Sequence, residues 1–395
     1  MEAAYSLYRI YLLGGGDRLR DIAFRVADFH CLGLRNGLLL TDYSIGKGKW
    51  YGYSVLRKRM ANTRQMGEAA YYLLKLYRLA NERGEARKEW LYVARKIGDF
   101  MIENQNKCIG FGKWWSTDGR RVVGDGTNGS YMIWLLAELY DLLGEEKYIC
   151  SAEKAAEFYI KNFVEKDMYW GDTLDADTID REGAHAIMRA MLMLYEETKE
   201  KKYLDVAKRA AYFVLTWMFF WDVPFSKNTF LGKIGYKTFG MTAVSIENQH
   251  LDPYGIIMAP DFAKLSRYSG KEMWREIAVA MADASLRLIS GLDLPLSTKM
   301  FYGYQPEQIY HTDWIYFKLL KLLARVLHNF KNGSPKGMFV NSVFWVVSAC
   351  LGGALDLAEE LGIKLGEIQI EFYGGIGFKI YKILQYLAAL LNIVI

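Results

Sequence analysis

The chain has 395 residues, 52% of them hydrophobic and 24% charged, so it is long and apolar enough to bury a large core and is not intrinsically disordered. Its 50 Lys and Arg residues against 45 Asp and Glu residues leave a net charge of +5 spread along the chain, which argues against a nucleic-acid partner. The 4 cysteines are widely spaced and form no CxxC pair, which argues against a disulfide framework and a zinc site.

The N-terminal residues do not form an export signal. Residues 1–13 carry Glu2 and Arg9 and lack both an apolar block and a small-residue cleavage site, so we expect a cytoplasmic protein. Two apolar stretches, 337–358 and 383–395, are compared with membrane spans. The first contains polar residues and the second is too short to cross a bilayer, so we interpret both as buried helices and expect no membrane partner.

Helical hairpins recur along the chain. In each, an amphipathic stretch with apolar residues three and four apart is followed by a short turn and a second such stretch. The first helices are predicted to begin near residues 64, 128, 181, 254 and 308, and the second helices are Trp90–Phe100, Tyr148–Phe163, Tyr203–Trp217, Met273–Ile289 and Met338–Leu361.

The period of this repeat favours a closed architecture. Successive hairpins begin roughly 50 to 70 residues apart, whereas TPR and HEAT units of open solenoids run about 34 to 47 residues. Helical stretches at 18–34 and 379–391 supply a sixth pair. We therefore predict an all-α protein, a single domain over 1–395 built as an (α/α)6 toroid, whose clearest hairpins lie within 62–361 and whose terminal helices close the ring.

Long segments precede the first helices, whereas the turns inside the hairpins are short. Loops carried at one end of a rigid scaffold commonly build a binding cleft, so we expect the functional site there. These segments, rich in Gly, Asn, Asp, Trp and Tyr, are 41–61, 110–128, 167–181, 221–253 and 290–306.

Acids and imidazoles recur together in two of these segments. Glu247 precedes His250, and Glu307 precedes His311, a combination that helix capping does not readily explain, although Glu307 also suits a first-turn acid. A third histidine, His185, lies one turn into a predicted helix, where a satisfied core histidine is an equal interpretation.

Several other polar residues have a simpler interpretation. Asp, Asn, Ser and Thr before a helix are good N-caps, so Asp125, Asn128, Asp180 and Asp252 are explained equally well as caps. Arg64 and Glu68, four residues apart, are a candidate surface ion pair. The aspartates at 172, 175, 177 and 180 lack the EF-hand pattern, and we predict neither a metal nor a cofactor.

Aromatic residues make up 15% of the chain, with 28 Tyr, 20 Phe and 11 Trp. Sugar rings pack their C–H faces on aromatic rings, while their hydroxyls bind Asp, Asn, Gln, Arg and His side chains. Aromatic residues within the helices, such as Trp217 and Trp345, are expected in the core. The loop aromatics favoured for stacking are Trp50, Trp114, Trp115, Trp170, Tyr236, Tyr302 and Tyr304.

The hairpins and three loop motifs resemble the six-hairpin glycosidase superfamily. The motifs are Asn62-Thr63-Arg64-Gln65, Gly124-Asp125-Gly126-Thr127-Asn128 and Glu247-Asn248-Gln249-His250-Leu251-Asp252. That superfamily includes glycoside hydrolases, polysaccharide lyases and N-acylglucosamine 2-epimerases, so the resemblance implies a fold and a carbohydrate substrate. The stretch 182–203 also resembles helical segments of the epimerases.

The main hypothesis is a glycoside hydrolase that cleaves an oligosaccharide or polysaccharide fragment with two carboxyl groups, one acting as acid and the other as base or nucleophile. The leading catalytic candidates are Glu247 and Glu307, with Asp125 and Asp177 as reserves. The candidates for substrate binding are Arg64, Gln65, Asn128, His250, Asp252, His311, Trp114, Trp115, Trp170, Tyr304 and Trp314.

Two alternatives stay open. One is a polysaccharide lyase or sugar 2-epimerase that abstracts a proton with His or Tyr. The other is a non-catalytic toroid that binds a glycan or a protein. The apolar C-terminal segment, 363–395, either completes the barrel or forms a homo-oligomer interface.

Overall fold

The structure of the chain is a computed structural model that describes residues 1–53, 59–105, 110–172, 174, 177–246, 250–289, 305–312, 336–337, 339–340 and 344–363. The chain divides into two compact units, Met1–Thr216 and Trp217–Ile395. The single domain over the whole chain stays a prediction.

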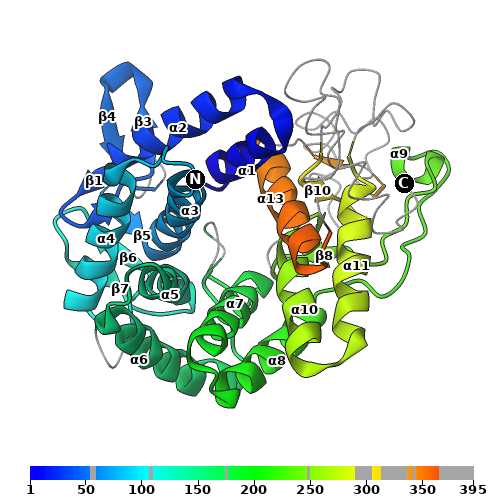
Figure 1. Cartoon of the computed structure of the whole chain (residues 1–395). Helices are drawn as coiled ribbons and strands as arrows, with labels where there is room; N and C mark the ends of the chain where they lie inside the picture. Colours follow the sequence, from blue (N-terminus) through cyan, green and yellow to red (C-terminus); the bar gives the residue numbers. More distant parts are fainter. Residues whose placement is uncertain are drawn as a thin grey trace. The chain divides into compact units, whose positions relative to one another are not determined.

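Consecutive helices of the first unit pack in pairs, α1 with α2, α3 with α4, α5 with α6 and α7 with α8 (Figure 1). The first pair is joined by a π-helical turn, Tyr11–Gly15. The helices are α1 (Glu2–Ile10), α2 (Asp17–Cys31), α3 (Thr63–Asn81), α4 (Lys88–Glu103), α5 (Tyr131–Leu143), α6 (Glu146–Asn162), α7 (Arg181–Thr198) and α8 (Lys201–Leu215).

The first helices of these pairs form one layer. Helix α3 packs against α1 and α5, and α5 packs against α7, while α4 packs against α2 and α6 in a second layer. Helices α3 to α8 confirm the three hairpins predicted in this region. Helix α1 was not predicted. Helix α1 packs against α2 as its hairpin partner. The sequence instead predicts the stretch 379–391 as the partner of α2.

Side chains and backbone conformation mark the helix boundaries. Asn62 caps α3 and Asp180 caps α7, each accepting a hydrogen bond from a backbone N–H three residues later. Gly144 and Lys199 end α5 and α7 in the left-handed conformation, with φ of 67° and 59°. Helix α5 is buried on every face from Tyr131 to Leu139, so it forms the centre of the core of the first unit.

The segments that precede α3 and α5 contain short strands. Strands β5, β6 and β7 form an antiparallel sheet in which Asn62 lies opposite Trp114, so the start of α3 is tied to the segment before α5. The strands of the first unit are β1 (Leu34–Arg35), β2 (Leu38–Leu39), β3 (Asp42–Ser44), β4 (Lys49–Tyr51), β5 (Met60–Asn62), β6 (Trp114–Ser116) and β7 (Arg121–Val123).

The second unit combines helices with a small sheet. Helices α10 and α11 confirm the fourth predicted hairpin, and α13 packs on α10. A buried cluster joins Leu251 and Ile309, which belong to the sheet, with Leu288, and the strand order of the sheet is β11-β10-β9-β8. The elements are α9 (Phe230–Lys233), β8 (Thr242–Ala243), β9 (Leu251–Asp252), α10 (Gly255–Ser269), α11 (Glu272–Leu286), β10 (Gln308–Ile309), β11 (Phe339–Val340) and α13 (Phe344–Glu360).

One predicted helix begins differently in the structure. Gln308–Ile309 is a strand rather than a helix start, because Ile309 pairs with Leu251 on one side and Phe339 on the other. The remainder of the helix predicted over 308–328 lies largely outside the described residues, as does 379–391. None of the helices formed by the described residues is both long enough and apolar enough to cross a membrane.

Candidate functional site

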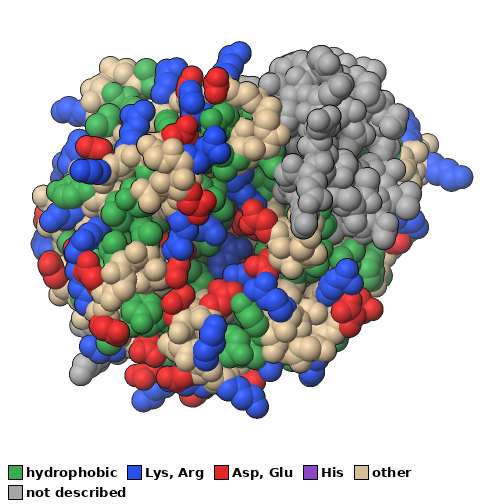
Figure 2. Space-filling model, viewed as in Figure 1, with side chains coloured by type: hydrophobic (Ala, Val, Ile, Leu, Met, Phe, Trp, Pro, Cys, Tyr) green, Lys and Arg blue, Asp and Glu red, His purple; other side chains and the backbone are tan. Residues whose placement is uncertain are grey.

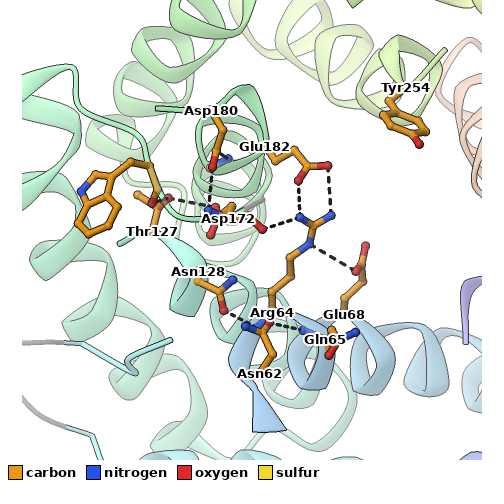
Figure 3. Close-up of polar contacts among 12 residues, drawn as sticks. Asn62, Arg64, Gln65, Glu68, Thr127, Asn128, Asp172, Asp180, Glu182 and Tyr254 are labelled. Carbon is orange, nitrogen blue, oxygen red and sulfur yellow. Dashed lines mark hydrogen bonds and ion pairs between the residues drawn. The ribbon is translucent and has the colours of Figure 1, made fainter. Parts of the chain in front are cut away.

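Polar side chains of the first unit gather where α3 and α7 begin (Figure 3). Arg64 and Glu68 lie in the first turns of α3, Glu182 in the first turn of α7, and Asp172 in the segment before α7. These helix starts meet because α3, α5 and α7 pack side by side in one layer. We define Arg64, Glu68 and Glu182 as the Arg64 cluster.

The guanidinium of Arg64 is shared between carboxylates and a carbonyl group. Nη1 donates to Oε2 of Glu182 and, over 2.8 Å, to the backbone oxygen of Asp172, and Nη2 donates to Oε1 of Glu182 over 3.3 Å. Nε lies 3.9 Å from Oε2 of Glu68. The guanidinium also lies 5.2 Å from the ring centroid of Tyr131. Because the pair with Glu182 is bidentate, each side chain fixes the orientation of the other.

Neighbouring segments hold the start of α3 in place. Oδ1 of Asn128 accepts from the backbone N–H of Arg64 over 2.8 Å, and Oδ1 of Asn62 accepts from the backbone N–H of Gln65 over 3.2 Å. The carbonyl oxygen of Lys113 accepts from the first N–H of the helix over 3.0 Å. The first N–H groups of a helix have no partner within it, so these three contacts satisfy them and position Arg64.

Asp172 is fully buried next to a second acid, Asp180. Oδ2 of Asp172 accepts from the hydroxyl of Thr127 over 3.0 Å, and its backbone N–H donates to Oδ2 of Asp180 over 2.8 Å. Oδ1 of Asp180 accepts from the N–H of Gly183 over 2.7 Å. Burial, reinforced by repulsion from Asp180, raises the pKa of Asp172 well above its ordinary value, which favours the protonated carboxyl.

Glu182 has the opposite tendency. Burial, the largest single influence, disfavours its charged form, but Arg64 and the neighbouring positive groups together hold the pKa of this carboxyl below its ordinary value. Arg181 and His185 act in the same direction, and both of these side chains are buried. Asp172 contacts Arg64 through its backbone and Glu182 through its side chain, and the pKa values of these two acids are shifted in opposite directions.

A second ion pair lies close to Asp172. Nζ of Lys113 pairs with Oδ1 of Asp177, and the Lys113 charge also acts on the Asp172 carboxyl. Asp177, a reserve catalytic candidate, therefore serves as the counterion of a lysine from the segment before α5.

The other sequence-predicted residues of the first unit are dispersed. Asp125 is exposed. Oε1 of Gln65 accepts from the hydroxyl of Thr41 over 3.2 Å. Trp170 is half-buried, and its backbone oxygen accepts hydrogen bonds from both the N–H and the hydroxyl of Thr127, each over 3.0 Å. Of these residues, Trp170 adjoins Thr127 and Gln65 follows Arg64 at the start of α3, whereas Asp125 lies exposed on the surface.

Trp114 and Trp115 lie in the core rather than on an accessible loop. Each is 1% exposed, and both belong to β6, the middle strand of its sheet. The ring of Trp114 contacts Tyr53 at a centroid distance of 5.8 Å, and that of Trp115 contacts Phe100 at 5.2 Å. Their positions give them a packing role.

The second unit places Glu307 beside Tyr254. The Tyr254 hydroxyl donates to Oε1 of Glu307 over 3.0 Å, and Glu307 is half-buried. Oδ1 of Asp252 accepts from the hydroxyl of Thr242 over 2.7 Å and from the N–H of Tyr254 over 2.9 Å. Asp252 is thus a buried structural acceptor just before α10, but it does not cap that helix, whose N-cap is Tyr254.

Two histidines of the second unit lie in the described part of the chain, and both are at least half-buried. His250 is buried, and His311 is half-buried with its ring 5.0 Å from that of Phe219. Burial, with the nearby charge of Lys336, lowers the pKa of His311. Glu247, Tyr304 and Trp314 lie outside the described residues.

Glu182 and Asp172 were not among the residues singled out from the sequence. The sequence offered little reason to choose them as site residues. Asp172 belonged to a run of acids, and Glu182 was an acid in the first turn of a predicted helix. Among the residues that the structure describes, no group of three His, Cys, Asp or Glu side chains is placed to hold a metal ion.

On the visible face of the first unit, Lys and Arg side chains are interspersed with Asp and Glu side chains (Figure 2).

Comparison with known proteins shows that the chain is similar to several solved structures. No family model matches the chain, and no curated protein matches it in sequence. It resembles the cellobiose 2-epimerase from Spirochaeta thermophila DSM 6192, with 10% identity, 91% of this chain and 86% of that chain covered, and a TM-score of 0.56. It also resembles the GH76 α-mannanase of Bacteroides thetaiotaomicron, with 13% identity, 92% and 86% coverage, and a TM-score of 0.55.

A sugar epimerase from a ruminal bacterium shows the same likeness, with 15% identity, 90% of this chain and 85% of that chain covered, and a TM-score of 0.55. At these identities the likeness establishes the fold alone. The predicted fold class is therefore confirmed: the chain is an all-α protein with the (α/α)6 fold.

Proposed function

We propose that the protein is a carbohydrate-active enzyme, specifically a glycoside hydrolase that cleaves an oligosaccharide or polysaccharide fragment. The observation that carries this proposal is the Arg64 cluster, in which guanidinium donors and carboxylate acceptors lie side by side on partly exposed side chains. A sugar hydroxyl both donates and accepts a hydrogen bond, so adjacent donors and acceptors match neighbouring hydroxyls. The fold shared with sugar-converting enzymes supports the same substrate class.

Cleavage of a glycosidic bond needs two carboxyl groups. We propose Glu247 and Glu307 as the acid and base. The hydrogen bond from Tyr254 supports the choice of Glu307, because it fixes the direction of a carboxylate that is only half-buried. Asp125 and Asp177 remain reserves, although pairing with Lys113 leaves Asp177 less suited to proton transfer.

Glu307→Gln and Glu247→Gln test the assignment. Each is expected to lower turnover of a glycan about 10³-fold without lowering the melting temperature, since loss of a general acid or base costs about this much. Glu276→Gln is the matched control, because Glu276 is an exposed acid of α11 in the same unit. Near-normal turnover in both variants would remove these two residues from the mechanism.

A sugar epimerase or lyase is the second candidate. The position of His185 favours it: His185 lies one turn after Glu182 on α7, is 6% exposed, and interacts electrostatically with that carboxylate. Incubation of mannan and cellulose oligosaccharides in D2O separates the candidates. A new reducing end indicates hydrolysis, deuterium in an otherwise intact sugar indicates epimerisation, and an unsaturated product absorbing in the ultraviolet indicates a lyase. Binding without any product would leave a glycan-binding protein.

A further inference from the structure

Within the Arg64 cluster itself two carboxylates face one guanidinium, while Arg181 and His185 act on Glu182 from outside the cluster. Its single guanidinium contacts two carboxylates, through the bidentate pair with Glu182 and the 3.9 Å approach of Nε to Glu68. Nη1 is fully used, because its second bond is donated to the backbone oxygen of Asp172. Arg64 is therefore neutralised within the protein before any ligand arrives.

The cluster nevertheless keeps a partly exposed face. The side chains of Arg64 and Glu182 are each 16% exposed, and that of Glu68 is 34% exposed. Nε of Arg64 is buried and makes no hydrogen bond to the described residues, so the exposed part of the cluster lies at the other atoms. Carboxylate oxygens can accept several hydrogen bonds each, so the exposed surface of the cluster offers mostly acceptors.

This distribution of hydrogen-bond donors and acceptors in the Arg64 cluster should distinguish neutral sugars from acidic ones. The hydroxyls of a neutral sugar donate to carboxylate oxygens and accept from a guanidinium N–H, so they meet both kinds of partner. The carboxylate of a uronic acid only accepts, and it approaches two like charges that already occupy the guanidinium. Like charges a few ångströms apart repel strongly at a partly buried site, where water screens them poorly.

We propose that the Arg64 cluster selects uncharged sugars and rejects uronic acids, and that Glu182 determines this specificity by occupying the guanidinium that a substrate carboxylate would otherwise bind. This inference rests on the proposed carbohydrate substrate but not on the reaction performed. It further implies that a protein without the Glu182 charge binds a uronic acid through Arg64, since Arg–carboxylate pairing is strong when the guanidinium is available.

The experiment compares binding of ligands that differ only in this charge. The probes are β-1,4-mannotetraose with the corresponding tetramannuronate, and cellotetraose with its C6-oxidised form, measured by isothermal titration calorimetry at neutral pH. The wild-type protein is expected to bind at least one neutral tetrasaccharide about tenfold or more tightly than its uronate counterpart. Equal or tighter binding of the uronates, or no binding of either neutral probe, would overturn the proposal.

Two variants locate the effect. Glu182→Gln retains a hydrogen-bond acceptor but removes the charge, and it is expected to strengthen uronate binding about tenfold while changing neutral binding less. The double variant Arg64→Met/Glu182→Gln is expected to lose this gain, because the guanidinium is gone. Should the gain fail to appear in a folded Glu182→Gln protein, or persist in the double variant, the assignment to Glu182 and Arg64 is wrong.

The chain supplies a matched control. Arg78, near the other end of α3, also pairs with two carboxylates, those of Glu138 and Asp141. It lies about 21 Å along the helix from Arg64, estimated from the helical rise of 1.5 Å per residue. Glu138→Gln is expected to leave the ratio of neutral to uronate binding unchanged.

Failure of this inference and failure of the proposed function give different results. If neutral glycans bind and are not cleaved, the hydrolase proposal fails while the charge selection stands. If the protein cleaves uronate-containing glycans as well as neutral ones, the hydrolase proposal stands and the charge selection fails.

Discussion

The ion pair between Lys113 and Asp177 joins a buried lysine to an exposed carboxylate. The side chain of Lys113 is 3% exposed and that of Asp177 is 55% exposed. An ammonium group in this position depends on its counterion, because burial of an unpaired charge is costly. The exposed partner therefore stabilises the buried one, and the two should respond very differently to substitution.

Asp177→Ala is expected to lower the free energy of unfolding by about 1–3 kcal/mol, because it leaves the Lys113 ammonium without its charged partner. Lys113→Met/Asp177→Ala should recover most of that loss, since both charges are then absent and the methionine stem can pack. Urea unfolding of the two variants measures the difference. If the double variant is less stable than Asp177→Ala, Lys113 contributes through a contact other than this pair.

Gly183→Ala is expected to destabilise the first unit by about 1–3 kcal/mol, a typical cost of overpacking. A Cβ at this position would lie 2.3 Å from the hydroxyl oxygen of Thr127 and 2.9 Å from Oδ2 of Asp172, so the polar contacts before α7 must shift. Gly46→Ala is the control, because a Cβ there meets no atom within 4 Å. Thermal unfolding that is equally unaffected in both variants would contradict the packing described at α7.

The helices, which depend on local patterns of residues, could be predicted from the sequence. Apolar residues at helical spacing identified α3 to α8, α10 and α11, because each of these helices must bury a continuous stripe. Asn128 and Arg64 were singled out by residue type and position. Helix α1 was not predicted, because residues 1–13 were considered only as a targeting segment.

The contacts between residues far apart in the sequence could not be predicted. Arg64 and Glu182 are separated by 118 positions, and spacing alone favoured the local pair with Glu68 over this one. Trp114 resembled a loop aromatic because the strand pairing that buries it, opposite Asn62, joins distant segments. The strand at Gln308–Ile309 likewise depends on partners elsewhere in the chain.

Asp172→Asn is expected to become more stable relative to the wild-type protein as pH rises above about 4. Because burial raises the pKa of Asp172 in the folded state, the folded protein binds more protons than the unfolded chain above the unfolded pKa, so the wild-type residue loses stability there. Asparagine resembles the neutral acid and still accepts from Thr127. Denaturation midpoints at pH 4 and pH 7 test this, and a difference between the proteins that does not change with pH would refute it.

Glu182→Gln should show the opposite pH dependence. The pKa of Glu182 is lowered in the folded state, so its contribution to stability is present above the unfolded pKa of about 4.5 and is lost as pH falls through the folded value. The variant should therefore be less stable than the wild-type protein at pH 7, and the deficit should shrink on acidification. The same two denaturation series measure it, and a deficit that grows toward acidic pH would contradict the pairing with Arg64.

Trp114→Ala and Trp170→Ala are expected to separate packing from binding. Trp114 is 1% exposed and packs against Tyr53, so its truncation should cost about 3–5 kcal/mol of stability.

Trp170 is half-buried, and the hydrogen bonds that it accepts from Thr127 use its backbone oxygen, which the variant retains. Trp170→Ala should therefore cost less stability but weaken glycan binding about tenfold if the indole stacks on a sugar ring. Calorimetric titration with the neutral tetrasaccharides, at a temperature where both variants are folded, measures the second effect. Unchanged affinity in Trp170→Ala would assign Trp170, like Trp114, to packing alone.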